Sequence, residues 1–222
     1  MGFLIAVDGV DASGKQTQTE LLQKRLSQES EVRLVSFPAY EQESSTLVKM
    51  YLNGEFGTKP EDVNAYAASV FFAADRYATF KKDWGKDYLD GKTIIADRYV
   101  SSNMIHQAGK IEDIREKNNF LEWLFDLEYN RLALPQPDIT IFLDMPPEYG
   151  ARLMRERANK ITGAAQKDIH ESNRGYLQKS YENALFVARK YNWQIISCVN
   201  GENIRTIEQI HDEIYQKIKQ LL

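Results

Sequence analysis

Five short runs of apolar residues are spaced along the chain, and each is bounded by polar residues or glycine. They cover residues 3–7, 32–37, 93–97, 139–144 and 194–199. A short, continuous apolar run is typical of a strand that is buried on both faces, as the strands of a parallel sheet are. The hydrophobic pattern therefore predicts a buried parallel strand at each run.

Segments with the apolar spacing of amphipathic helices separate these runs. The predicted helices cover residues 15–26, 63–80, 120–132 and 204–221. Pro60, Glu61 and Asp62 suit the first turn of the second helix, because proline and acidic residues are favoured there. Strands that alternate with helices predict an α/β fold, with a five-stranded parallel sheet covered by helices on both faces.

Three of the predicted strands end at, or lead directly into, an aspartate: Asp8, Asp97 and Asp144. The carboxyl ends of parallel strands meet at one edge of a sheet, and ligands of open α/β sheets bind beyond that edge. We therefore expect these carboxylates to lie at the ligand-binding edge of the fold.

Composition limits the classes of protein to which the chain can belong. Its 222 residues fit one domain, which we predict to span residues 1–222. The net charge of −4 argues against a broad nucleic-acid surface, which needs clustered basic residues. No apolar run approaches the roughly 18 residues of a membrane span, and no basic leader opens the chain. The single cysteine, Cys198, excludes an internal disulfide, so we expect a cytoplasmic protein with no membrane partner.

A glycine-rich loop follows the first predicted strand and opens the first predicted helix. Residues 9–17 read GVDASGKQT, in which Gly9, Gly14 and Lys15 have the spacing of a phosphate-binding loop. Glycines allow backbone amides to surround an anion, and the lysine supplies a charge for the β- and γ-phosphates of a nucleotide. The loop therefore predicts a nucleotide site.

Gln16 departs from the usual loop pattern, which places Ser or Thr after the lysine to bind Mg²⁺. Thr17 lies one residue further on, about 100° around the helix, so it does not simply replace that ligand. Asp97 ends a predicted strand beside the loop and is the expected Mg²⁺-organising carboxylate, with water completing the coordination. The Gln16 side chain could bond a phosphate oxygen or hold a metal-bound water.

Other segments carry groups that suit a phosphorylated base. Arg98 can bind a phosphate through its planar fork of donors. Phe72 and Arg76 lie four residues apart on a predicted helix, so they share a face that can stack on a base and bond its edge. Residues 157–175 are polar, rich in cations and weakly periodic, which predicts a mobile lid. A core position for Phe72 and a surface ion pair for Arg98 are the structural alternatives.

The ordered combination of these segments resembles the thymidylate kinase (dTMP kinase) family of P-loop nucleoside monophosphate kinases. The resemblance runs nearly end to end, through GVDASGKQTQ, SFP, FFAADRY, DRYVSSN, LPQPD and KDIHE. It implies the three-layer fold of P-loop NTPases with a mobile lid. It also implies transfer of the γ-phosphoryl group of ATP to dTMP with Mg²⁺, which gives dTDP for dTTP biosynthesis, by a homodimeric enzyme.

The resemblance further implies a role for each matching position. Residues expected to bind ATP are Gly9, Val10, Asp11, Ala12, Ser13, Gly14, Lys15, Gln16 and Thr17. Residues expected to bind dTMP are Asp11, Tyr40, Phe72, Arg76, Arg98 and Asn103. The expected catalytic residues are Lys15, Asp11, Arg98 and the lid arginine Arg157, while Asp168 and Glu171 would help to close the lid.

Within the dTMP site, Phe72 would stack on thymine, Arg76 would bond its edge and Asn103 would lie near the ring. Arg98 would hold the phosphate of dTMP, and Asp11 would lie near the sugar and that phosphate.

The sequence also departs from the family at several positions. Ala12 and Ala39 stand where some members carry arginines. The catalytic cation is therefore expected to come from the lid, and phosphate binding is expected to depend more strongly on Arg98. His106 stands where an aromatic residue often lies near the sugar 2′ position, which leaves deoxyribose selectivity open. Two other functions stay open: a kinase for another nucleoside or nucleotide, and a nucleotide-binding regulator without turnover.

Overall fold

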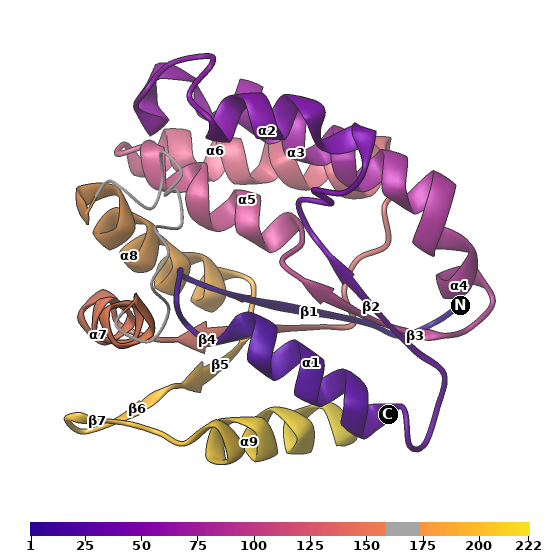
Figure 1. The fold of residues 1–222 in the computed structure, drawn as a ribbon. Helices are drawn as coiled ribbons and strands as arrows, with labels where there is room; N and C mark the ends of the chain where they lie inside the picture. The colour runs from indigo at the N-terminus through magenta and orange to yellow at the C-terminus, as the bar shows by residue number, and fades with distance from the viewer. Residues whose placement is uncertain (159–173) are drawn as a thin grey trace.

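The structure, a computed structural model, describes residues 1–158 and 174–222. Five parallel strands form its central sheet, in the order β2-β3-β1-β4-β5 (Figure 1). They are β1 (Leu4–Gly9), β2 (Val32–Ser36), β3 (Thr93–Asp97), β4 (Ile139–Asp144) and β5 (Gln194–Ser197). The predicted α/β fold and its five parallel strands are confirmed, each within two residues of the predicted bounds.

Helices connect these strands and cover the sheet. They are α1 (Lys15–Leu26), α2 (Thr46–Leu52), α3 (Ala65–Thr79), α4 (Gly85–Leu89), α5 (Val100–His106), α6 (Ile114–Phe125), α7 (Pro147–Ala158), α8 (Arg174–Lys190) and α9 (Ile207–Lys219). A small hairpin, β6 (Val199–Asn200) with β7 (Asn203–Ile204), follows β5. The apolar spacing did not predict α2, α4, α5, α7, α8 or this hairpin. Within the described ranges, no helix is long and apolar enough to cross a membrane.

Alternate residues of β1 face two different helical layers. Leu4 and Ala6 pack in one core cluster with buried residues of α5, α6 and α8. Ile5 and Val7 pack in a second cluster with buried residues of α1 and α9, the two helices drawn below the sheet in Figure 1. Because both faces of the strand are buried, its sequence is a continuous apolar run.

Two of the predicted helices begin later than expected, and a capping side chain explains each start. The second predicted helix begins at Ala65, where the Asn64 side chain accepts a bond from the N–H of Ala67, and residues Pro60–Asp62 form a separate 3₁₀ turn. The last helix begins after Thr206, which forms a capping box with Gln209. In each case a side chain satisfies backbone N–H groups that the first turn leaves unpaired.

The helix predicted over residues 120–132 is wrong at both ends. It begins at Ile114, where the side chain of Asp113 accepts a bond from the N–H of Glu116. Regular α-helix ends at Phe125, and the chain continues as a π-helical segment, Asp126–Arg131. A second π-helical segment, Phe80–Trp84, follows α3. A π-helical turn shifts the angular position of the residues that follow, and such turns are frequent at functional sites.

Candidate active site

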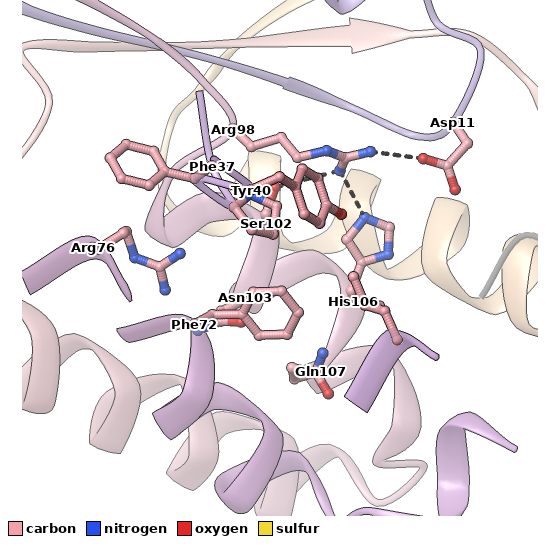
Figure 2. A pocket seen from close by; sticks show the side chains of 12 residues that line it. Asp11, Phe37, Tyr40, Phe72, Arg76, Arg98, Ser102, Asn103, His106 and Gln107 are labelled. Carbon is pink, nitrogen blue, oxygen red and sulfur yellow. Dashed lines mark hydrogen bonds and ion pairs between the residues drawn. The ribbon is translucent and has the colours of Figure 1, made fainter. Parts of the chain in front are cut away.

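A pocket lies beyond the carboxyl ends of the central strands, beside the loop between β1 and α1 (Figure 2). Its empty space is about 550 Å³, which includes the open solvent at its mouth. Its lining residues are Asp11, Phe37, Pro38, Tyr40, Leu52, Phe72, Arg76, Arg98, Ser102, Asn103, His106 and Gln107. All six residues expected to bind dTMP therefore line one pocket, although their roles there stay predictions.

The loop between β1 and α1 has the backbone geometry of an anion cradle. Gly14 has a φ of 85°, a conformation that side-chain-bearing residues rarely adopt, and it leads directly into α1. A Cβ atom at Gly9 would lie 2.5 Å from the Ser13 hydroxyl and 3.0 Å from the carbonyl oxygen of Leu143, so a larger residue would require these neighbours to shift. Ala12 also adopts a positive φ, of 61°. The loop thus takes up a strained, open turn at a helix N-terminus, where anions bind.

Lys15 bonds to the loop itself. Its Nζ donates to the carbonyl oxygens of Gly9 at 2.8 Å and Val10 at 2.9 Å. Burial, together with the nearby charge of Arg98, lowers the pKa of Lys15 to about 8. An anion in the loop would therefore gain a bond to a cation that is held in place and poorly solvated.

The Gln16 side chain points along α1. Its Nε2 donates to Oε1 of Glu20 at 2.9 Å, across one exposed turn of the helix. The amide nitrogen is therefore engaged by a carboxylate. The two roles considered for Gln16, bonding a phosphate and holding a metal-bound water, stay predictions.

Asp97 ends β3 near the loop, and its surroundings suit a cation. Burial raises the pKa of its carboxyl, and the charges of Asp8 and Glu20 raise it further, while Lys15 and Arg98 oppose them. In the described part of the chain no group of three or more His, Cys, Asp or Glu could hold a metal ion. Mg²⁺ commonly needs only one or two carboxylates plus phosphate and water, so Asp97 fits that mode of binding.

Arg98 lies between Asp11 and His106, as the dashed lines of Figure 2 show. Its Nη2 donates to Oδ1 of Asp11 at 2.7 Å, and its Nη1 lies 3.3 Å from Nε2 of His106. A guanidinium has no acceptor, so Nε2 of His106 must be the unprotonated nitrogen in this contact. The backbone of Arg98 has a φ of 67°, which is strained for a residue with a side chain. Strain of this kind concentrates at functional sites.

The Asp11–Arg98 ion pair is charged on both sides. Burial favours the neutral acid, but the charges of Arg98 and Lys15 hold the pKa of Asp11 well below its usual range. Burial also disfavours the guanidinium, yet Asp11 and the neighbouring Asp8 raise the pKa of Arg98 above its usual value. Asp11 is therefore a carboxylate, and not a proton donor, at neutral pH.

Asp8 connects the loop with helix α5. This fully buried carboxylate accepts hydrogen bonds from the hydroxyls of Ser101 and Ser102, both at 2.8 Å, and from the backbone N–H of Gly9 at 2.9 Å. The serines open α5, which carries Asn103 into the pocket. The sequence pattern placed Asp8 at this edge of the sheet but assigned it no partner.

The far side of the pocket from Asp11 holds Arg76 (Figure 2). Its Nε and Nη2 donate to the two carboxylate oxygens of Glu128, at 2.7 and 2.5 Å, and both side chains are almost fully buried. Asn103 donates its Nδ2 to Glu128 and to the carbonyl oxygen of Ser69, both at 3.2 Å. Phe72 also lines the pocket.

Three residues around the pocket were missed in the sequence pattern. Asp75 interrupts a mostly apolar helix, which is a detectable signal of a buried partner. Glu128 lies in the polar segment DLEYNR and gives no such signal. Asp75 accepts bonds from the N–H of Ala39 at 2.9 Å and the hydroxyl of Ser44 at 2.6 Å, so it holds the segment that carries Tyr40. Gln107 gives no signal in the sequence.

Gln107 is fully buried and lines the pocket. Neither its Oε1 nor its Nε2 has a hydrogen-bond partner among the described residues. A buried amide without partners is costly, and a ligand edge with both a donor and an acceptor would satisfy it.

The predicted lid falls largely outside the described residues. Residues 159–173, with Asp168 and Glu171, are not described, and neither is the side chain of Arg157. The roles expected for these residues therefore stay predictions.

Comparison with known proteins identifies the family. A family model described as thymidylate kinase matches residues 7–214. The probable thymidylate kinase of Thermococcus gammatolerans is 30% identical over 223 residues, which cover 99% of this chain and 97% of that protein. The thymidylate kinase of Mycobacterium tuberculosis is 30% identical over 182 residues, which cover 80% of this chain and 82% of that protein.

A solved structure agrees on the fold. The thymidylate kinase of Candida albicans superposes with a TM-score of 0.69 at 24% identity, over 99% of this chain and 92% of that one. The family model spans the loop, the DRY segment at the end of β3 and most of α9. The chain therefore belongs to the thymidylate kinase family.

Proposed function

We propose that dTMP binds in the pocket of Figure 2 and that ATP places its phosphates in the loop between β1 and α1. The activity is that of a thymidylate kinase, a phosphotransferase that uses ATP. One observation carries the placement: a single pocket joins the aromatic ring of Phe72 to the guanidinium of Arg98, beside the loop. A base and a phosphate on the same ligand would need this combination.

The proposed mechanism is mainly electrostatic. The acceptor is a phosphate oxygen that is already anionic, so the reaction needs no strong general base. The protein must bring two anions together, and Lys15 and Arg98 would reduce their repulsion from opposite sides. Asp11, held as a carboxylate by Arg98, would orient that guanidinium and the sugar.

We propose that Asp97 organises Mg²⁺, because its half-buried carboxylate ends β3 beside the loop, with Asp8 and Glu20 nearby. The metal would neutralise charge on the phosphates of ATP. Arg157 is proposed as the lid arginine that adds positive charge near the transferred group. Residues 1–222 are proposed to form one domain, since β1 at one end of the chain and α9 at the other pack in the same core cluster.

The test of the function is an ADP-release assay over a panel of acceptors with ATP and Mg²⁺. The panel contains dTMP, dUMP, dCMP, ribothymidine 5′-monophosphate, dGMP and thymidine. The fastest turnover is expected with dTMP. A different preferred acceptor would identify a kinase for another substrate. Nucleotide binding without ADP release for any acceptor would identify a regulator.

Replacement of Gln107 by leucine tests whether the buried amide takes part in binding dTMP. The KM for dTMP is expected to rise about tenfold, because the ligand loses hydrogen bonding to the amide. The unfolding free energy without ligand is expected to stay the same or increase by up to about 1 kcal/mol, because an unpaired buried amide is removed. Steady-state kinetics and urea unfolding measure the two effects.

The control for this variant is Gln28→Leu, the same change at an exposed turn. It should leave the KM for dTMP unchanged. A strongly destabilised Gln107→Leu protein with normal KM would show that the amide is structural instead.

A homodimer is also proposed, and one face of α3 supports it. Tyr66, Val70, Ala74 and Tyr77 recur at three- and four-residue spacing and are exposed, with 46% of Val70 accessible. An exposed apolar stripe of this kind suits association with a second copy of the chain. The other candidate face, on α6, is mostly occupied, because Phe120 and Leu124 are buried in the core.

Replacement of Val70 by aspartate is therefore expected to dissociate the dimer, since a charge would be desolvated at the centre of the stripe. Sedimentation velocity measures the result. Leu89→Asp makes the same change at an exposed apolar residue of α4 and should leave the dimer intact. A wild-type monomer, or an undisturbed dimer in Val70→Asp, would contradict the proposal.

A further inference from the structure

Glu128 does not line the pocket, yet it bonds to two side chains that do. It lies in the π-helical segment Asp126–Arg131, and its side chain is fully buried. Its oxygens accept two bonds from Arg76 and one from Asn103. One carboxylate therefore connects the side chains that α3 and α5 present at the same end of the pocket.

The bonds to Glu128 fix which part of Arg76 a ligand can meet. Nε and Nη2 form a two-point contact with the carboxylate, which sets the plane of the guanidinium. Nη1 is the guanidinium nitrogen that these bonds leave unused. Since a guanidinium has donors only, Arg76 offers the pocket a hydrogen-bond donor.

The same carboxylate fixes the amide of Asn103. The amide faces two acceptors, the carbonyl oxygen of Ser69 and the carboxylate of Glu128, each at 3.2 Å. Only the NH₂ group can satisfy both, so the orientation of the amide follows from its partners. Its Oδ1 is left as an acceptor for a ligand in the pocket.

We propose that Glu128 is a positioning residue that selects a keto pyrimidine over an amino pyrimidine. With Glu128 in place, the pocket presents a donor from Arg76 and an acceptor from Asn103. Thymine and uracil carry the complementary pair, the O4 carbonyl and the N3–H group. Cytosine carries an amino group and an unprotonated N3 at these positions, so donor would meet donor and acceptor would meet acceptor.

This inference rests on the proposed binding of dTMP in the pocket and adds the residue that sets its selectivity. In a Glu128→Gln protein, one carboxylate oxygen becomes an NH₂ group, which cannot accept from Arg76 or Asn103. The amide of Asn103 can then turn, and the guanidinium can rotate. The pocket would no longer present one fixed arrangement of hydrogen-bond donor and acceptor.

The experiment compares the dissociation constants of dTMP and dCMP, by direct and displacement calorimetry. The dissociation constant of dCMP divided by that of dTMP is expected to fall at least about tenfold in Glu128→Gln. The variant no longer holds a donor and an acceptor in the arrangement that mismatches cytosine. The dissociation constant of ATP should not change. Glu122→Gln, the same chemical change at an exposed site on α6, should leave the ratio unchanged.

Removal of one partner from a buried ion pair destabilises a protein, so each variant is checked by thermal unfolding. Where Glu128→Gln does not fold, Glu128→Asp decides by the same ratio, because it keeps the charge but is too short to hold both partners. An unchanged ratio in the folded variant overturns the role of Glu128. Failure of the wild-type protein to bind dTMP overturns the proposed function instead.

Discussion

Replacement of Lys15 by alanine is expected to lower kcat about 10³-fold and to leave the protein folded. The Nζ atom of Lys15 is held against two loop carbonyls, so the cation is already placed where an anion would enter the loop. The substitution removes a positive charge from a buried site, where water screens the charge of the phosphates poorly. Single-turnover and steady-state assays with ATP and dTMP measure the effect.

The matched control is Lys24→Ala, which removes an exposed lysine from the same helix. It should retain normal kcat. A Lys15→Ala protein with a near-normal rate would contradict the assignment of the loop as the ATP site.

The lowered pKa of Lys15 adds a signature that depends on pH. In the free protein the pKa is about 8, and a bound phosphate should raise it towards the ordinary lysine value of about 10.4. Between these values the complex holds a proton that the free protein lacks, so ATP binding at pH of about 9 takes up protons. Calorimetry in buffers of different ionisation enthalpy should detect this uptake in the wild type and not in Lys15→Ala.

The same shift has a defined effect on stability. Between pH of about 8 and about 10.4, the unfolded chain binds more protons at this lysine than the folded, ligand-free protein does. The contribution of Lys15 to the free energy of unfolding therefore rises with pH across this window.

Replacement of Arg98 by alanine is expected to lower kcat/KM for dTMP about 10³-fold, with little change in the affinity for ATP. Arg98 contacts Asp11 and His106 inside the pocket, and it is the proposed partner of the acceptor phosphate. Arg98→Lys should recover only part of the activity, because an ammonium group lacks the planar fork of donors. Arg131→Ala removes an exposed arginine and is the control.

The backbone of Arg98 allows the loss of the side chain to be separated from the strain at this position. Because φ is 67°, Arg98→Gly should be more stable than Arg98→Ala by about 1 kcal/mol, while both lose activity equally. Chemical denaturation compares the two variants. Equal stability would show that the left-handed conformation is not imposed on the free protein, and normal kcat/KM in either variant would contradict the phosphate-binding role.

Much of the fold could be predicted from the sequence because buried parallel strands leave a strong signal. Residues 4–7 and 141–143 are continuous apolar runs because helices cover both of their faces. Helix α5 was missed because its residues Val100–His106 include two serines and an asparagine, which favour helix weakly. Its position is set by tertiary bonds, such as those of Ser101 and Ser102 to Asp8.

The candidate site also contains residues that could be predicted from the sequence and residues that could not. Residues on continuous motifs, such as Phe72 and Arg98, could be predicted because the motif itself carries the geometry. Glu128 could not be paired with Arg76, which lies 52 residues earlier, because only the fold brings them together. The contact of Gln16 with Glu20 is a four-residue helical pair, and so it was within reach of the sequence.

Helix α3 serves several parts of the molecule at once. One side presents Phe72 and Arg76 to the pocket, and the opposite side exposes the stripe around Val70. Asp75 forms hydrogen bonds with the segment that carries Tyr40. A second subunit bound to that stripe would contact the same helix that presents Phe72 and Arg76 to the pocket. Thermodynamic linkage then requires that any gain in dTMP affinity on association be matched by an equal gain in dimer affinity on binding dTMP.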